Sequence, residues 1–330
     1  VLNDSHAKVL ITGTKQLYDS LEPRKTELAH LSPDTIVCVD GVDGYLRWDD
    51  FGLTNQLKKV RGDVMGKPTK RIEVAVVPAR LEDAAVMCYG AGPDDAVRPT
   101  ELSHGNILSN ILARELVMPL KQQDVSMSFV SWANPVGLAF DLLGMVRSGG
   151  LVNVCEGRQR LRRDVMESRP SILVATAPSI TVLKEQVDRD CVDKVYLWAW
   201  NLAISTLRKQ RAGDDSTAVA LLNRFFSKFV IGRVKPLLGG KLSHLIFAGS
   251  RPNEEDREFF EIMGVRTTEM VHASGAAGPV AFFACHDALT MAPVGTPLPS
   301  LNLRVVDGQL HISGPSVAPS SEAARDGWGS

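Results

Sequence analysis

The chain alternates short runs of apolar, often β-branched residues with longer stretches whose apolar positions recur at helical spacing. This alternation is typical of βα units around a mostly parallel sheet, so the predicted fold class is α/β. Strands are expected at residues 8–12, 35–39, 73–77, 126–131, 151–154, 171–176 and 244–248. Helices are expected at residues 105–119, 137–148, 158–168, 178–190 and 217–230.

The pattern changes near the end of the chain. Between residues 295 and 314, apolar residues alternate with polar ones on both sides of Asp307-Gly308. Alternation around an Asp-Gly pair predicts a β-hairpin, here part of a small β subdomain. Residues 315–330 are rich in Ser, Ala, Pro and Gly without periodicity, which predicts an extended tail.

Composition limits the classes of partner. With 330 residues, 44% hydrophobic and 23% charged, the chain can bury a sizeable core. Its 37 Lys and Arg balance 38 Asp and Glu, so the overall charge gives no reason to expect nucleic acid or anionic lipid as the main partner. No apolar run reaches the roughly 18–20 residues of a membrane helix, so the chain is not expected to cross a bilayer.

Cysteine usage bears on the compartment. The cysteines are odd in number, widely spaced and without a CxxC pair; they are Cys38, Cys88, Cys155, Cys191 and Cys285. Buried thiols in a reducing, intracellular compartment fit this pattern better than a disulfide framework or a zinc site. No metal site is predicted, and an organelle such as the mitochondrion stays open because no targeting segment can be read.

The first candidate site is the loop after the expected strand around Cys88. A strand, a glycine-containing loop and a helix follow one another, which is the geometry of a phosphate-binding loop. The residues argue against this function, because Asp94 and Asp95 would repel an anion and only Arg98 supplies positive charge. A plain surface loop is the favoured interpretation.

The second candidate is the small, glycine-rich loop 270–279, a composition that lets a ligand approach the backbone. His272 and Ser274 are its only polar side chains, and a structural role for His272 is favoured. A third segment, 244–256, is a strand leading to a helix with Asn253 as N-cap, and the helix dipole explains its acidic first turn.

A fourth candidate is a run of basic residues on the expected helix 158–168. It consists of Arg158, Arg160, Arg162 and Arg163. A solvated helix face is the favoured interpretation, and a protein-docking patch is the alternative.

Taken in order, the segments resemble an AMP-forming acyl-CoA synthetase of the long-chain fatty acid type, within the adenylate-forming superfamily. The similar blocks are residues 1–5, 102–110, 128–150, 168–174, 238–242, 294–299 and 326–328. The resemblance implies the N-terminal domain of these enzymes, two α/β sheet subdomains plus a small β subdomain, with the C-terminal domain absent. It divides the chain into an α/β domain (1–292), a β-hairpin remnant (293–314) and a tail (315–330).

The resemblance also exposes differences from the family's phosphate loop, Tyr-Thr-Ser-Gly-Thr-Thr-Gly-x-Pro-Lys-Gly. In an ungapped register, Tyr89 and Gly92 match, whereas Asp94 replaces a hydroxyl residue and Asp95 replaces a glycine. Arg98 stands for the lysine. The resemblance therefore implies a degenerate phosphate loop.

Two further family positions differ. The family block Tyr-Gly-Met-Thr-Glu-Thr, which stacks on adenine and helps to hold magnesium, falls on residues 271–276, where Gly275 replaces the glutamate beside His272 and Ser274. Asn134 stands where a family histidine lines the acyl pocket. Losing the metal carboxylate and the lysine together implies a large loss of adenylation rate.

These differences predict a catalytically inactive relative, without cofactor, that serves as a structural or interaction subunit of a larger protein assembly. The alternative is a protein that binds fatty acid or acyl-CoA, or a residual long-chain fatty acid–CoA ligase. A third interpretation is an active ligase represented by its middle part. Binding of a small acyl ligand is left open, and no nucleic-acid partner is expected.

Overall fold

The structure is a computed structural model that describes part of the 330-residue chain and divides it into two compact units, residues 1–78 and 79–330. The described residues are 7–14, 16, 19–20, 36–39, 46–47, 78–91, 97–191, 193–211, 213, 216–249, 252–273, 275–284, 295–306 and 309–319. The predicted division at residues 292 and 314 stays a prediction.

The first unit contains a small parallel sheet of the order β1-β2-β3. Its strands are β1 (Leu10–Thr12), β2 (Ile36–Cys38) and β3 (Leu46–Arg47). The predicted strands at 8–12 and 35–39 are confirmed over these shorter spans, whereas the strand predicted at 73–77 lies outside the described residues.

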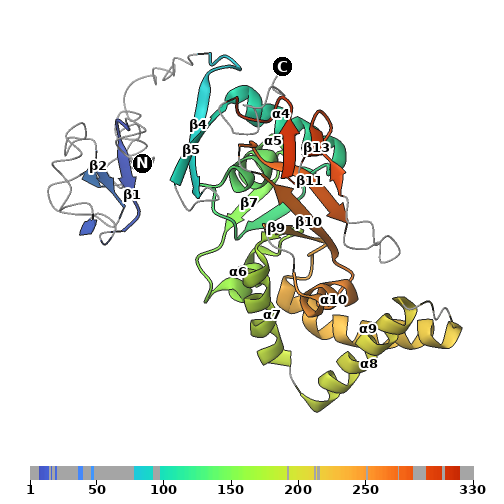
Figure 1. Cartoon of the computed structure of the whole chain (residues 1–330). Coiled ribbons are helices and arrows are strands. Elements are labelled where there is room, and N and C mark those ends of the chain that lie inside the picture. The colour runs from blue at the N-terminus through green and yellow to red at the C-terminus, as the bar shows by residue number, and fades with distance from the viewer. Residues whose placement is uncertain are drawn as a thin grey trace, which may run out of the picture. The chain divides into compact units, whose positions relative to one another are not determined.

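A seven-stranded sheet organises the second unit, in the order β12-β11-β10-β9-β8-β6-β7 (Figure 1). Its strands are β6 (Val125–Ser128), β7 (Leu151–Val154), β8 (Ile172–Ala175), β9 (His244–Ala248), β10 (Arg266–His272), β11 (Pro279–Ala284) and β12 (Thr296–Pro297). The run from β7 to β10 is parallel, and β11 and β12 add an antiparallel edge. The α/β prediction is confirmed.

Helices of the second unit connect these strands. They are α4 (His104–Val117), the π-helix η3 (Gly137–Leu143), α5 (Gly144–Ser148), α6 (Leu161–Ser168), α7 (Ala177–Cys191), α8 (Lys194–Arg211), α9 (Thr217–Val234), the 3-10 helix η4 (Lys235–Leu238) and α10 (Glu254–Ile262). The five predicted helices are present, but the one predicted at 137–148 begins as a π-helix. The pattern did not predict α8. No helix in the described part of the chain is both long and apolar enough to span a bilayer.

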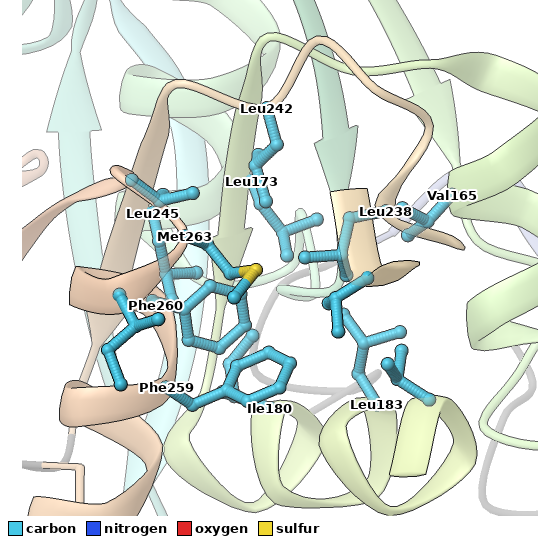
Figure 2. Close-up of a cluster of buried hydrophobic side chains, with 14 of the residues drawn as sticks. Val165, Leu173, Ile180, Leu183, Leu238, Leu242, Leu245, Phe259, Phe260 and Met263 are labelled. Carbon is cyan, nitrogen blue, oxygen red and sulfur yellow. The ribbon is translucent and has the colours of Figure 1, made fainter. Parts of the chain in front are cut away.

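Strands β8 and β9 are buried on both faces, as expected of the centre of a parallel sheet. Leu173 and Leu245 join a core with α6, α7 and α10, which includes Phe259 and Phe260 (Figure 2). Alternate residues of the same strands, such as Ile246, join a second core with β10 and β11. These two cores fix the strands whose carboxyl ends form the candidate site.

Two hairpins complete the second unit. The hairpin β13 (Asn302–Val306) and β14 (Gln309–Ser313) confirms the prediction for 295–314, except that 296–297 form β12 of the central sheet. The other hairpin pairs β4 (Ala84–Ala91) with β5 (Val97–Ser103). The predicted order of strand, loop and helix is wrong here, because a second strand lies between the loop and α4.

Candidate active site

The carboxyl ends of β8, β9 and β10 lie at one edge of the central sheet, where open α/β sheets bind ligands. Strand β10 ends at His272, whose side chain is exposed. Strand β9 is followed by Gly249, which has a φ of 93°. A Cβ at Gly249 would lie 3.8 Å from Cε1 of His272, so the two strand ends adjoin. His272 therefore lies at the sheet edge where open α/β folds bind ligands, and Gly249 leaves the backbone beside it accessible.

The backbone of the glycine-rich loop after β10 is held by the segment that follows β14. The Ala318 N–H donates to the Gly275 carbonyl at 2.8 Å, and the Ala277 N–H donates to the Ser316 carbonyl at 2.8 Å. Gly275 is buried with a φ of 87°, a backbone conformation that side chains other than glycine rarely adopt. The backbone thus fixes this turn, and Ser274 lies outside the described residues.

Helix α4 ties these two segments together. Nδ2 of Asn106 donates to the carbonyls of Pro315 at 2.8 Å and Val317 at 3.2 Å. Nδ2 of Asn110 donates to the Pro279 carbonyl at 2.9 Å. We refer to residues 103–110, 275–279 and 314–318 together as the loop cluster. Sequence reasoning missed both asparagines, because their partners lie 169–211 residues away in the chain.

Strand β4, which leads into the first candidate loop, packs against the loop cluster. Cys88 of β4 shares a small buried core with Ala277 and Ala318. The strand that leads into the first candidate loop and the glycine-rich loop are therefore neighbours in space.

The positions predicted in this first loop are only partly described. Tyr89 pairs in register with Pro99, and its hydroxyl donates to Sδ of Met87 at 3.1 Å. Arg98 belongs to strand β5, opposite Gly90, instead of standing in a loop, which corrects its predicted place. The other predicted positions, Gly92, Asp94 and Asp95, lie outside the described residues.

Asn134 lies at the surface, just before the π-helix η3. Its Oδ1 accepts the Val136 N–H at 2.9 Å, and its carbonyl accepts the Leu138 N–H at 3.0 Å. These bonds give the side chain a helix-starting role. Its predicted place in an acyl pocket stays a prediction.

Two buried ionisable side chains near this region escaped the sequence reasoning. Arg114 of α4 is fully buried, donates from Nη1 to the Met118 carbonyl at 3.1 Å and lies 5.8 Å from the ring centre of Phe140. Asp141 of η3 is also buried and accepts the Ser126 hydroxyl at 2.5 Å. Burial raises the pKa of Asp141, which the hydrogen bond from Ser126 opposes.

The Asp141 carboxyl is expected to make stability depend on pH. Its pKa in the folded protein lies above the ordinary 3.8, so its contribution to stability is present at low pH and is lost as pH rises through the raised pKa. Asp141→Asn keeps an acceptor for Ser126 without the charge. Thermal melts of both proteins between about pH 4 and pH 8 should show the midpoint difference moving in favour of the variant as pH rises.

The matched control is Asp83→Asn, at an exposed position whose carboxylate accepts the Arg80 N–H at 2.8 Å. Its melting profile is expected to follow that of the wild type. A midpoint difference between Asp141→Asn and the wild type that stays constant with pH would contradict the prediction.

The basic run of the fourth candidate is paired with nearby acids. Arg160 pairs with Glu156, Arg162 with Asp190 and Arg163 with Glu167. Arg158 is exposed. Three of the four positive charges thus face a carboxylate, and the predicted docking role stays a prediction.

A divalent cation does not fit the described residues of this region. Within the described ranges, no group of three His, Cys, Asp or Glu side chains is placed to hold a metal ion. Gly275, where the resemblance puts the metal carboxylate, has no side chain to bind a metal ion. We therefore derive no step through a metal.

Comparison with known proteins identifies the family. Residues 1–320 match the family described as AMP-binding enzyme, and the chain belongs to that family. Long-chain-fatty-acid–CoA ligase 5 of Rattus norvegicus is 26% identical over 262 residues, which are 76% of this chain and 36% of the rat protein. Ligase 6 of Mus musculus is 22% identical over 263 residues, 74% of this chain and 37% of its own. The chain thus spans little more than a third of these curated relatives.

Solved structures show the same fold. A long-chain-fatty-acid-CoA ligase from Archaeoglobus fulgidus superposes with a TM-score of 0.61 at 15% identity, over 96% of this chain and 55% of that one. An anthranilate CoA ligase in complex with anthranoyl-AMP gives 0.66 at 14% identity, over 97% and 52%. The expected fold, that of the N-terminal domain of adenylate-forming enzymes, is confirmed.

The expectation of a catalytically inactive structural subunit is wrong. The family match over residues 1–320 and the curated relatives are those of AMP-binding CoA ligases, which supports the alternative of a ligase instead. That expectation rested on single side chains in two loops, whereas the backbone of the second loop is held by hydrogen bonds to Ser316 and Ala318. The absence of a nucleic-acid partner and the presence of an acyl ligand stay predictions.

Proposed function

We propose that this protein is an AMP-forming acyl-CoA ligase that acts on long-chain carboxylates. In this reaction a carboxylate oxygen bonds to the α-phosphorus of ATP as pyrophosphate leaves, and the thiol of CoA then displaces AMP from the acyl carbon. The proposal rests on the family match and on the packing of Cys88 against Ala277 and Ala318. This packing places strand β4, which leads into the first nucleotide segment, beside the second, glycine-rich segment. The similarity to long-chain-fatty-acid–CoA ligases 5 and 6 supports the substrate class.

The ligand region of this proposal is the sheet edge at His272 and Gly249 together with the loop cluster. Gly249 carries no side chain, is exposed and has a φ of 93°, so a ligand can approach the main chain closely there. His272 is the exposed ring at this edge and can donate a hydrogen bond to a phosphate or carboxylate oxygen.

The proposed activity predicts a different response to the same substitution at the two ends of the sheet. His272→Ala should lower kcat/KM for palmitate about tenfold, because a charge-assisted hydrogen bond is worth roughly 1.5–3 kcal/mol. His244→Ala is the control, since His244 begins β9 at the opposite edge and should leave kcat/KM unchanged. The measurement is AMP release that depends on palmitate and CoA.

Two results would overturn the proposed function. One is the absence of ATP–pyrophosphate exchange with any long-chain fatty acid in protein that melts cooperatively. The other is AMP release with benzoate as fast as with palmitate, which would refute the long-chain substrate class.

We also propose that the protein works in a reducing, intracellular compartment. Cys88, Cys155 and Cys191 are free thiols. Burial raises the pKa of Cys155 to about 11 and also raises the pKa of Cys88 and Cys191. Protonated thiols of this kind react slowly, which supports a structural role for them.

A further inference from the structure

Helices α8 and α9 lie side by side (Figure 1). They carry several large apolar side chains that are exposed. On α9, the exposed residues Leu221, Phe225 and Phe229 recur every four positions and form one stripe. Leu221 is 70% exposed and Phe225 is 68% exposed, so large side chains that normally enter a core face the outside here. The opposite side of α9, with Val230 and its neighbours, is buried in the core.

An exposed tryptophan extends the stripe onto α8. Trp198 is 59% exposed, and its ring meets Phe226 edge-on at 5.2 Å between centres. Phe226 in turn packs against Phe225 at 5.4 Å. We call the surface formed by Trp198, Leu221, Leu222, Phe225 and Phe229 the aromatic ridge. A continuous exposed apolar surface of this kind marks an interaction site.

The charges on the two helices that form the aromatic ridge have one sign. Neither α8 nor α9 contains Asp or Glu. Their basic residues are Lys194, Arg208, Lys209, Arg211, Arg224, Lys228 and Arg233. On α9, Arg224 and Lys228 follow Leu221 and Phe225 by three positions, so they flank the stripe and are exposed. The overall charge balance of the chain concealed this local excess.

Acidic neighbours offset only part of this charge. Arg208 forms a two-bond pair with Glu258 at 3.0 and 2.9 Å, and Arg233 pairs with Asp193 at 2.5 Å. The link between the helices carries Asp214 and Asp215, which lie outside the described residues. Among the side chains that the structure describes, which do not include that of Arg211, exposed positive charge therefore remains at four positions. They are Lys194, Lys209, Arg224 and Lys228.

We propose that the aromatic ridge docks onto the surface of an anionic phospholipid bilayer. Helices that lie in a membrane interface combine Trp, Phe and Leu with flanking Lys and Arg, and their binding grows with apolar area and with attraction to anionic lipid. A tryptophan at the edge of the apolar surface suits the headgroup level. The positive charge favours this occupant over a second copy of the chain, whose own ridge would bring like charges together. The proposal does not depend on ligase activity.

The test is flotation of the purified protein with phosphatidylcholine vesicles, with and without roughly 30% phosphatidylserine. We expect at least about tenfold tighter binding to the anionic vesicles, because each basic residue near the surface contributes roughly fivefold. Leu221→Ser/Phe225→Ser should lower binding to the anionic vesicles at least about tenfold. The matched control is Leu116→Ser/Val305→Ser, since both side chains are exposed apolar residues outside the ridge.

A second pair of variants separates charge from apolar area. Arg224→Glu/Lys228→Glu should remove the preference for phosphatidylserine. Lys121→Glu/Arg158→Glu makes the same change in net charge at exposed positions elsewhere in the second unit and should keep the preference. Binding to anionic vesicles should also shift the tryptophan emission to the blue, and Trp198→Phe should abolish most of that shift.

Three outcomes would overturn the proposal. The first is equal binding to neutral and anionic vesicles. The second is a loss of vesicle binding in the Leu116→Ser/Val305→Ser control as large as that in Leu221→Ser/Phe225→Ser. The third is a protein that does not bind vesicles but forms a dimer that Leu221→Ser/Phe225→Ser disrupts. Ligase activity in the absence of vesicles tests the proposed function separately.

Discussion

Phe260→Ala is expected to lower the free energy of unfolding by about 3–5 kcal/mol and the melting temperature by roughly 10 °C. Phe260 is fully buried in the core of α6, α7, α8 and α10 beneath the sheet (Figure 2). Its ring lies 5.0 Å from that of Phe259 at an interplanar angle of 81°, an edge-to-face pair. The substitution loses the transfer free energy of the ring and leaves a cavity that tightly packed neighbours cannot fill.

The control is the same substitution at an exposed position. Phe225→Ala removes an identical ring that is 68% exposed, so its unfolding free energy should change by less than about 1 kcal/mol. Urea unfolding of both variants measures the two changes in unfolding free energy. The dependence of that free energy on urea concentration is compared with the wild type. Similar losses in both variants would show that burial at Phe260 is not what stabilises this unit.

The strands that build this core could be predicted, because the central strands of a parallel sheet are short, continuously apolar runs. The runs at 171–176 and 244–248 became β8 and β9. Strand β5 was missed because it contains Pro99, which breaks a sheet ladder. The proline is tolerated because the hairpin β4–β5 has only two strands, each with a free edge.

Two helices show a different limit of the pattern. Helix α8 is rich in aromatic and β-branched residues, which favour helices weakly, so packing against α9 and α10 outweighs intrinsic propensity. The start of the helix predicted at 137–148 is a π-helix, which shifts the side-chain period and places Asp141 against Ser126. A period of 3.6 does not predict that contact.

The separate segments of the candidate site could be predicted from the sequence, but the contacts that bring these segments together could not. His272 at a strand end and the glycine-rich loop were recognised from composition alone. The bonds from Asn106 to Pro315 and Val317, however, join segments about 210 residues apart. Neither asparagine stands out in the sequence. Asn106 is the N3 residue of a capping box and Asn110 is a buried helix residue, and the amino acid type does not distinguish these two roles.

Gly278→Ala is expected to destabilise the protein by about 1–3 kcal/mol or more and to displace the backbone of the loop cluster. A Cβ at Gly278 would lie 2.3 Å from Oδ1 and 2.9 Å from Cγ of Asn110. Asn110 is buried and its Nδ2 is bonded to the Pro279 carbonyl, so its amide cannot move aside without losing that bond. The methyl group must therefore separate α4 from the loop, a steric change of the kind that costs about 1–3 kcal/mol or more.

A second variant distinguishes this contact from a general need for glycine. Asn110→Ala removes the clashing amide at a cost of roughly 1–2 kcal/mol for the lost hydrogen bond. In that background, Gly278→Ala should cost much less than in the wild type, so the double-mutant cycle should give a coupling energy of about 1–3 kcal/mol. Unfolding midpoints of the four proteins measure it. Additive losses would place the strain in the backbone of Gly278 instead of at Asn110, and would refute the proposed bracing of the loop by α4.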